Sequence, residues 1–166
     1  TNPSGKMPVS VPRSVGNIPA YYNHKPTARR GYAFADVTPL YAFGEGMSYT
    51  AFDISEPILS SSIMGVDEET SVSVEVTNTG MMAGEEVVQL YIRDKVSSVT
   101  RNVKDLKGFK RVSLAPGETK TVTLPIRKES LWFYNLDMER VVEPGEFDIM
   151  IGNSSQNVKS VTLTVQ

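Results

Sequence analysis

From Phe52 onward, apolar and polar residues alternate along short segments that are separated by turn sequences rich in Gly, Pro and Asn. In residues 71–77 every second residue is apolar, so one face of the segment would be apolar, and the same alternation recurs in later segments. Short strands with turns at this spacing predict an all-β fold, a two-sheet antiparallel sandwich. The predicted strands are residues 52–54 with 58–59 nearby, 71–77, 87–93, 106–114, 119–126, 145–151 and 158–165.

The first fifty residues lack this alternation. Prolines interrupt them repeatedly, and most of the aromatic residues of the chain lie in this part. A long segment without regular structure is uncommon inside a compact domain, and aromatic rings in such a segment need a surface to pack against. The pattern therefore predicts an extended, irregular N-terminal arm. Residues 6–11 alternate around Pro8 and could form one edge strand, but the sequence shows no evident pairing partner for it.

Residues 39–52, with the sequence PLYAFGEGMSYTAF, combine four aromatic residues with Gly44 and Gly46. Glycine permits backbone conformations that a Cβ atom would forbid. The segment is similar to the PFGYGLSYT-type motif of family 3 glycoside hydrolases, which joins the second domain to a C-terminal fibronectin type III-like domain. Ala42 stands where that family usually has Pro, and Glu45 stands where it often has an aromatic residue.

The resemblance covers nearly the whole chain. Residues 2–26 are similar to the last strand and following loop of the α/β domain in that family, whereas residues 74–94, 106–126 and 142–155 resemble successive parts of the C-terminal sandwich.

The resemblance implies a domain division and a set of partners. Residues 1–50 would be the end of the α/β domain with a linker arm, and residues 51–166 an immunoglobulin or fibronectin type III-like sandwich. The partners would be the catalytic barrel and α/β domains of the same parent enzyme, a β-glucosidase or β-xylosidase acting on a β-glucoside or an oligosaccharide. The family resemblance also implies a periplasmic or secreted location.

Retaining glycosidases need two carboxylates, a nucleophile and an acid/base. In family 3 these residues lie in the barrel and upstream in the α/β domain, and neither motif occurs in this sequence. Glu85 and Glu86 are interpreted as solvated loop charges. We therefore expect no catalytic residue and no cofactor in this chain, and a structural role in stabilising the catalytic domains.

Composition excludes several other functions. The chain has no cysteine and a single histidine, His24, so it has neither disulfides nor a histidine-based metal cage, and no metal site is expected. A net charge of -2 disfavours nucleic acid and anionic membranes as partners. The basic residues 104, 107, 110 and 111 around Phe109 are better explained as protection of a sheet edge than as a nucleic-acid footprint.

Several residues are candidates for contact with a ligand or with another domain. Residues 21–25 combine aromatic, amide and basic groups that would either stack on a sugar or satisfy their own loop. Glu45 would contact a ligand or an arginine of a partner. Arginines 29 and 30 would pair with acidic residues of the absent domains. The candidates are Tyr21, Tyr22, His24, Arg29, Arg30, Tyr41, Phe43, Glu45, Tyr49 and Trp132.

The segment around Trp132 has two interpretations. Trp132, Phe133 and Tyr134 are consecutive aromatic residues, and they would serve either in core packing or as a platform on which sugars stack. The second interpretation defines an alternative function, an autonomous carbohydrate-binding sandwich. Exposure separates the two, because a platform needs coplanar rings in water.

Overall fold

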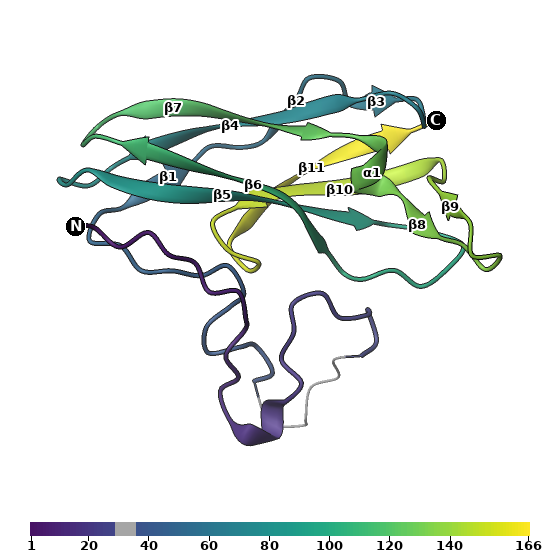
Figure 1. Ribbon diagram of the computed structural model, residues 1–166, viewed down its shortest axis with the longest axis horizontal. Coiled ribbons are helices and arrows are strands. Elements are labelled where there is room, and N and C mark those ends of the chain that lie inside the picture. Colours follow the sequence, from purple (N-terminus) through teal and green to yellow (C-terminus); the bar gives the residue numbers. More distant parts are fainter. Residues whose placement is uncertain (29–35) are drawn as a thin grey trace.

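The computed structural model describes residues 1–28 and 36–166, and its strands run from Phe52 to Val165 (Figure 1). The fold is nearly all β, as the alternation predicted. Its elements are η1 (Val15–Asn17), β1 (Phe52–Ile54), β2 (Ile58–Leu59), β3 (Ile63–Met64), β4 (Thr70–Asn78), β5 (Gly84–Asp94), β6 (Asp105–Leu114), β7 (Thr119–Ile126), α1 (Lys128–Leu131), β8 (Phe133–Tyr134), β9 (Arg140–Val141), β10 (Gly145–Gly152) and β11 (Val158–Val165).

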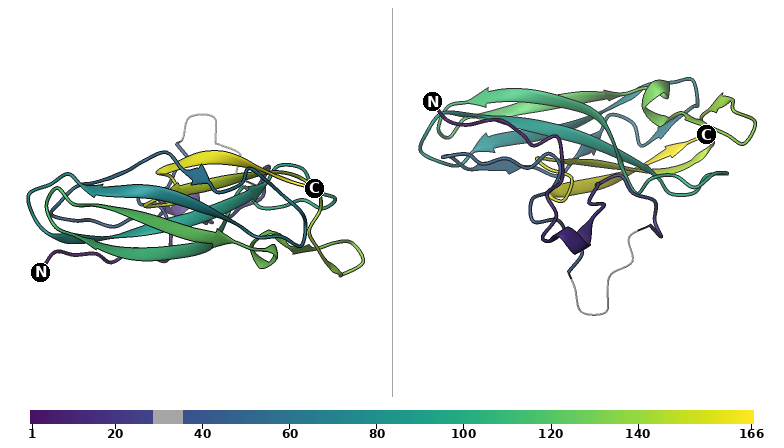
Figure 2. Two further views of the ribbon diagram at one scale, coloured as in Figure 1. Left: turned by 90° about the horizontal axis from the view of Figure 1, so that it is seen from above. Right: turned by 60° about the horizontal axis from the view of Figure 1, so that its bottom comes forward.

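Two sheets lie face to face (Figures 1 and 2). The first contains β1, β4 and β2, with β7 paired to β4, and the second has the order β3-β11-β10-β5-β6. A third, two-stranded sheet joins β8 and β9. Strand β6 lies at an edge of the second sheet, so the basic residues 107, 110 and 111 are on an edge strand, as the interpretation as edge protection requires. Lys104 precedes this strand.

The apolar faces predicted by the alternation form the core between the two sheets. Val72, Val74 and Val76 of β4 point toward the second sheet and are almost completely buried. Full burial of each aliphatic side chain contributes roughly 1.5–3 kcal/mol, so this face holds the sandwich together. Other buried residues of the core are Val88, Leu90, Ile92, Leu114, Val122, Leu124, Ile126, Phe147, Ile149, Ile151, Leu163 and Val165.

The prediction of an entirely antiparallel sandwich is wrong at one pair of strands. Residues Ile63 and Met64 of β3 pair in parallel with Thr164 and Val165 of β11. The chain first pairs with the other sheet through β2 and then crosses to the second sheet within a few residues. Because it crosses without reversing direction, it meets β11 running the same way.

In the described part of the arm, residues 1–28 and 36–50, some residues pack on the side of the second sheet that faces away from the first sheet, and the segment that contains η1 extends away from it (Figures 1 and 2). Residues 6–11 do have a pairing partner in this chain, namely residues 40–45. Met7 N donates to Glu45 O at 2.9 Å, and Gly44 N donates to Met7 O at 2.8 Å. These bonds fold the arm back on itself, so its two ends reach the sandwich together.

Candidate interface between the arm and the sandwich

Strand β5 is buried on both faces. Val88 and Leu90 belong to the core, while Gln89 and Tyr91 on the opposite face are only 3% and 0% exposed. A sheet with one wet face would alternate apolar and polar residues, whereas a sheet that is covered on both faces shows a continuous apolar run. The sequence VVQLYI in β5 is such a run, interrupted only by Gln89. It is the signal from which the covering by the arm could have been predicted.

Three aromatic rings connect the arm to this outer face. The rings of Tyr22 and Phe43 are stacked with centroids 4.2 Å apart, and Tyr22 meets Tyr91 edge-on at 5.7 Å. Leu106 N at the start of β6 donates to the Tyr22 hydroxyl at 3.2 Å. Burial raises the pKa of Tyr22 and of Tyr91, so both phenols are neutral at pH 7. The contact is therefore aromatic packing between uncharged rings.

Gln89 is a buried polar residue that holds two loops to β5. Its Nε2 donates to the carbonyl oxygens of Gly44 at 2.9 Å and of Asn153 at 2.8 Å, and its Oε1 accepts from the Tyr91 hydroxyl. The amide thus has partners for both of its ends, as a buried amide requires. Sequence reasoning missed this residue. The signal for it was a lone polar side chain within an apolar strand.

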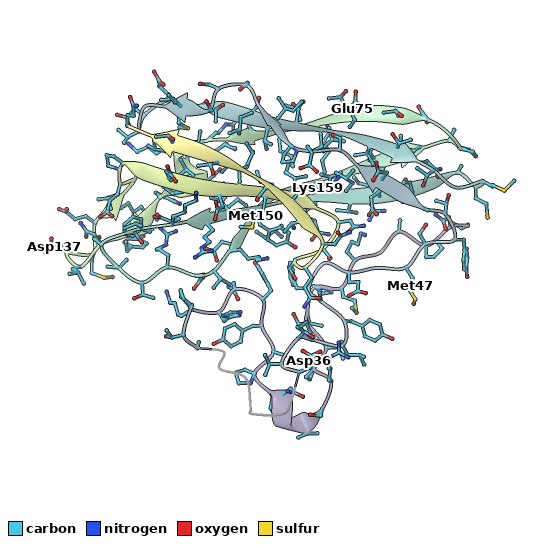
Figure 3. All side chains as sticks on the ribbon, turned by 180° about the vertical axis from the view of Figure 1, so that it is seen from behind. Asp36, Met47, Glu75, Asp137, Met150 and Lys159 are labelled. Atoms are coloured by element: carbon cyan, nitrogen blue, oxygen red, sulfur yellow. The ribbon has the colours of Figure 1, made fainter. Side chains whose placement is uncertain are left out.

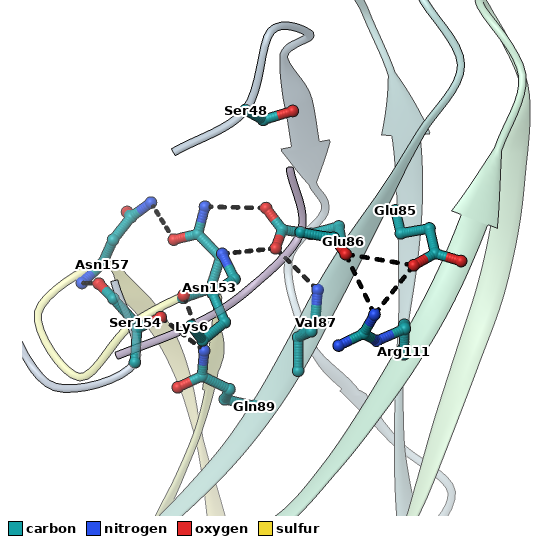
Figure 4. A network of polar contacts seen from close by, with 12 residues as sticks. Lys6, Ser48, Glu85, Glu86, Val87, Gln89, Arg111, Asn153, Ser154 and Asn157 are labelled. Carbon is teal, nitrogen blue, oxygen red and sulfur yellow. Dashed lines mark hydrogen bonds and ion pairs between the residues drawn. The ribbon is translucent and has the colours of Figure 1, made fainter. Parts of the chain in front are cut away.

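An ion pair between Lys6 and Glu86 also connects the arm to the sandwich (Figure 4). The two charged atoms are 2.6 Å apart, and the side chains are 15% and 6% exposed. The Glu86 carboxylate also accepts from Val87 N at 2.7 Å and from Asn153 Nδ2 at 3.4 Å. The interpretation of Glu86 as a solvated loop charge is therefore wrong. Glu86 lies within β5, where it pairs with Val112, and the arm brings Lys6 over it.

Glu85 does keep the surface environment that was predicted, although it lies in β5 rather than in a loop. It is partly exposed, and it accepts hydrogen bonds from Ser113 Oγ and from the guanidinium of Arg111. These bonds lower the pKa of the Glu85 carboxyl. Ser4 of the arm donates to the same carboxylate at 3.2 Å, so Glu85 adds a polar contact at the rim of the interface.

The structure brings only some of the candidate residues into this interface. Tyr22 and Phe43 are part of it, whereas Tyr21, Tyr41 and Tyr49 are exposed. Tyr49 is the most exposed of these three, at 74%. Arg29 and Arg30 lie outside the described residues.

His24 and Glu45 both make contacts within the chain. Val103 N donates to the carbonyl oxygen of His24 at 2.9 Å, which fastens the arm to the segment before β6. The His24 Nδ1 atom lies 2.9 Å from the carbonyl oxygen of Lys25. The Glu45 carboxylate accepts from Ala42 N at 2.8 Å and closes its own turn.

The aromatic residues around Trp132 do not form a flat exposed platform. Phe133 is 8% exposed and has the Arg101 guanidinium 4.5 Å from its ring centroid. Arg140 covers the Trp132 ring at 3.8 Å. Cations over aromatic rings in this way stabilise local packing, and the geometry favours packing over sugar stacking.

Trp132→Ala is expected to lower the thermal stability of the chain, because it removes a half-buried ring together with its cation–π contact to Arg140. Titration calorimetry with soluble β-glucans is expected to give no saturable heat for either the original chain or this variant. Saturable binding that disappears in the variant would instead support the carbohydrate-binding module.

Neither a metal site nor a membrane span is found in the described residues, 1–28 and 36–166. No group of three or more His, Cys, Asp or Glu side chains there is arranged to hold a metal ion. In the same part of the chain, no helix has the length and apolar character needed to cross a membrane.

Comparison with known proteins identifies the class of domain and then the family. Residues 86–155 match the fibronectin type III-like domain family. The chain is 47% identical to a β-xylosidase of Formosa agariphila over 99% of its own length and 24% of the relative's length. It is also 47% identical to the periplasmic β-glucosidase of Salmonella typhimurium, over 95% of the chain and 22% of that protein.

Solved structures agree with these relatives. A β-glucosidase from Erythrobacter marinus superposes with a TM-score of 0.96 at 46% identity, covering 99% of this chain and 22% of that one. The β-glucosidase of Listeria innocua in complex with glucose gives a TM-score of 0.91 at 38% identity, covering 99% and 24%. The chain therefore contains a fibronectin type III-like domain. It corresponds to the C-terminal part of β-glucosidases and β-xylosidases of the glycoside hydrolase family 3 type, and it spans less than a quarter of the length of these relatives.

Proposed function

We propose that this chain is the non-catalytic C-terminal portion of a β-glucosidase-like glycoside hydrolase, and that it stabilises the catalytic domains of that enzyme. Residues 1–50 would be the end of the α/β domain with its linker arm, and residues 51–166 the fibronectin type III-like sandwich. The parent enzyme would hydrolyse β-glucosides or related oligosaccharides, an assignment supported by the relatives named above.

One observation supports this role above all others: the described part of the arm packs on the sandwich at some residues and leaves large apolar side chains exposed at others. Phe43 of the arm stacks on Tyr22, Gly44 O accepts a hydrogen bond from Gln89 of β5, and Lys6 pairs with Glu86 of β5. Elsewhere the arm leaves large apolar side chains in water, including Val15 and Tyr49. Met47 is another, and Figure 3 labels it. Soluble proteins rarely expose apolar groups together without a partner. The catalytic barrel and α/β domains of the parent enzyme are the partners proposed for these side chains.

A periplasmic or secreted location is proposed for the parent enzyme. Its support is the periplasmic β-glucosidase of Salmonella typhimurium, which is 47% identical to this chain.

The purified chain is expected to show no turnover of aryl β-glucosides or aryl β-xylosides, because both carboxylates of the double displacement would lie in the absent domains. The measurement is release of the aryl group over a range of pH at high protein concentration. Two matched preparations, one carrying Glu45→Gln and the other Glu86→Gln, control for a contaminating enzyme. Turnover by the original chain that is abolished in either variant would overturn the proposed role.

A further inference from the structure

A small cavity of about 110 Å³, lined by both polar and apolar groups, lies where the arm meets the sandwich. Tyr22 forms one of its walls, whereas Phe43, which stacks on Tyr22, does not line it. The residues that line it are Ser10, Tyr22, His24 and Pro39 from the arm, and Val103, Lys104, Ser155 and Gln156 from the sandwich. Most of these side chains can donate hydrogen bonds, and none of them is acidic.

Lys104 is the charged group of this cavity. Its Nζ donates to the carbonyl oxygen of Ser155 at 2.7 Å, which uses one of its three donors. The side chain is half-buried, and no carboxylate among the described residues forms an ion pair with it. Burial and the nearby charge of Arg93 lower the pKa of Lys104. Lys6, another lysine at the junction of arm and sandwich, is by contrast neutralised by Glu86.

The walls of the cavity are held in place by bonds that do not involve a ligand. Leu106 N fixes the Tyr22 hydroxyl, and Val103 N bonds the carbonyl oxygen of His24. Ser155 N donates to the carbonyl oxygen of Phe43 at 2.9 Å. The donors around Lys104 are therefore positioned before anything binds, which reduces the ordering cost of binding.

We propose that this cavity receives the carboxylate of an aspartate or glutamate from the catalytic domains of the parent enzyme, with Lys104 as its counter-ion. This inference rests on the proposed function. A half-buried ammonium gains most from an ionised hydrogen-bond acceptor, and the hydroxyls of Ser10 and Tyr22 are further donors for the second carboxylate oxygen. Because both the arm and the sandwich line the cavity, the bound carboxylate contacts both of them.

The direct test is zero-length carbodiimide coupling in the full-length protein, followed by peptide mass spectrometry. The expected result is an amide between Lys104 and an Asp or Glu that lies outside residues 1–166. Lys110, an exposed lysine on the same edge of the sheet, is the matched control and is expected to form no such amide. Coupling of Lys104 only within residues 1–166, or equal coupling of Lys110, would overturn the proposal.

A second measurement uses variants of the full-length protein. Lys104→Met is expected to shorten the half-life of activity at elevated temperature about tenfold, as expected for losing one charge-assisted bond, while Lys104→Arg and Lys110→Met retain it. If Lys104→Met behaves like Lys110→Met although removal of the sandwich destabilises the enzyme, this inference fails and the proposed function stands. If removal of the sandwich changes nothing, the proposed function fails.

A small carboxylate is the alternative occupant, and glucuronate is the probe for it. Binding of glucuronate to the full-length protein is expected to be absent, because the site is already filled by a side chain. Saturable binding that is lost in Lys104→Met would show that a free sugar acid occupies the cavity, and would overturn the docking proposal.

Discussion

Lys6→Met is expected to lower the free energy of unfolding of the chain by about 3 kcal/mol. The substitution removes the cation 2.6 Å from Glu86 and leaves a buried carboxylate without its counter-charge. Two further hydrogen bonds, from Val87 N and Asn153 Nδ2, remain but do not neutralise it. If the arm detaches so that water reaches Glu86, the contacts of the arm are lost instead, so stability falls by either route.

Urea unfolding at pH 7 measures this loss. The double variant Lys6→Met with Glu86→Leu is the matched control, because replacing a buried ion pair by apolar residues is often nearly neutral, and it is expected to recover most of the stability. Lys110→Met controls for the loss of an exposed lysine. A loss for Lys6→Met no larger than that for Lys110→Met would mean that the arm does not rest on the sandwich as described.

Gly44→Val is expected to lower the free energy of unfolding by about 3 kcal/mol and to detach residues 40–45 from β5. Gly44 has a φ of 78°, which a β-branched residue adopts only under strain. In addition, a Cβ atom at this position would lie 2.0 Å from Oε1 of Gln89. The Gln89 amide would have to move and give up its bond to Gly44 O. The substitution therefore strains the backbone and also breaks the hydrogen bond that holds this segment to β5.

Two glycines separate these effects. Gly117 has a similar φ of 73°, and a Cβ atom added there would meet open space, so Gly117→Val measures the strain of the backbone alone. Gly5 has nothing within 4 Å, so Gly5→Ala is expected to be nearly neutral. Unfolding curves give the energies, and amide exchange at residues 40–45 reports detachment. Equal losses for Gly44→Val and Gly117→Val would argue against a clash with Gln89.

The strands could be predicted because their alternation is local. Each segment such as residues 71–77 carries its own apolar face, and burying that face decides both its structure and its register. The residue at which β5 begins was harder to predict. Gly84 to Glu86 are polar or small, and they join the sheet because β6 continues opposite them.

The interface depends on contacts between distant parts of the sequence, and the sequence predicts these poorly. The aromatic motif indicated that Phe43 needs a surface, but not that Tyr22 and Tyr91 supply it. Glu86 and Gln89 resemble ordinary polar residues until the arm is placed over them. The parallel pairing of β3 likewise follows from where the chain crosses between sheets, which no residue type encodes.

We propose that this part of the protein stabilises the catalytic domains without taking part in the chemistry. The most direct measurement compares thermal inactivation of the full-length protein with that of a variant lacking residues 51–166, assayed on an aryl β-glucoside. The truncated protein is expected to lose activity at least roughly tenfold faster at elevated temperature. The KM of the fraction that stays folded at low temperature is expected to be unchanged. An equal rate of inactivation in the two proteins would contradict the proposal.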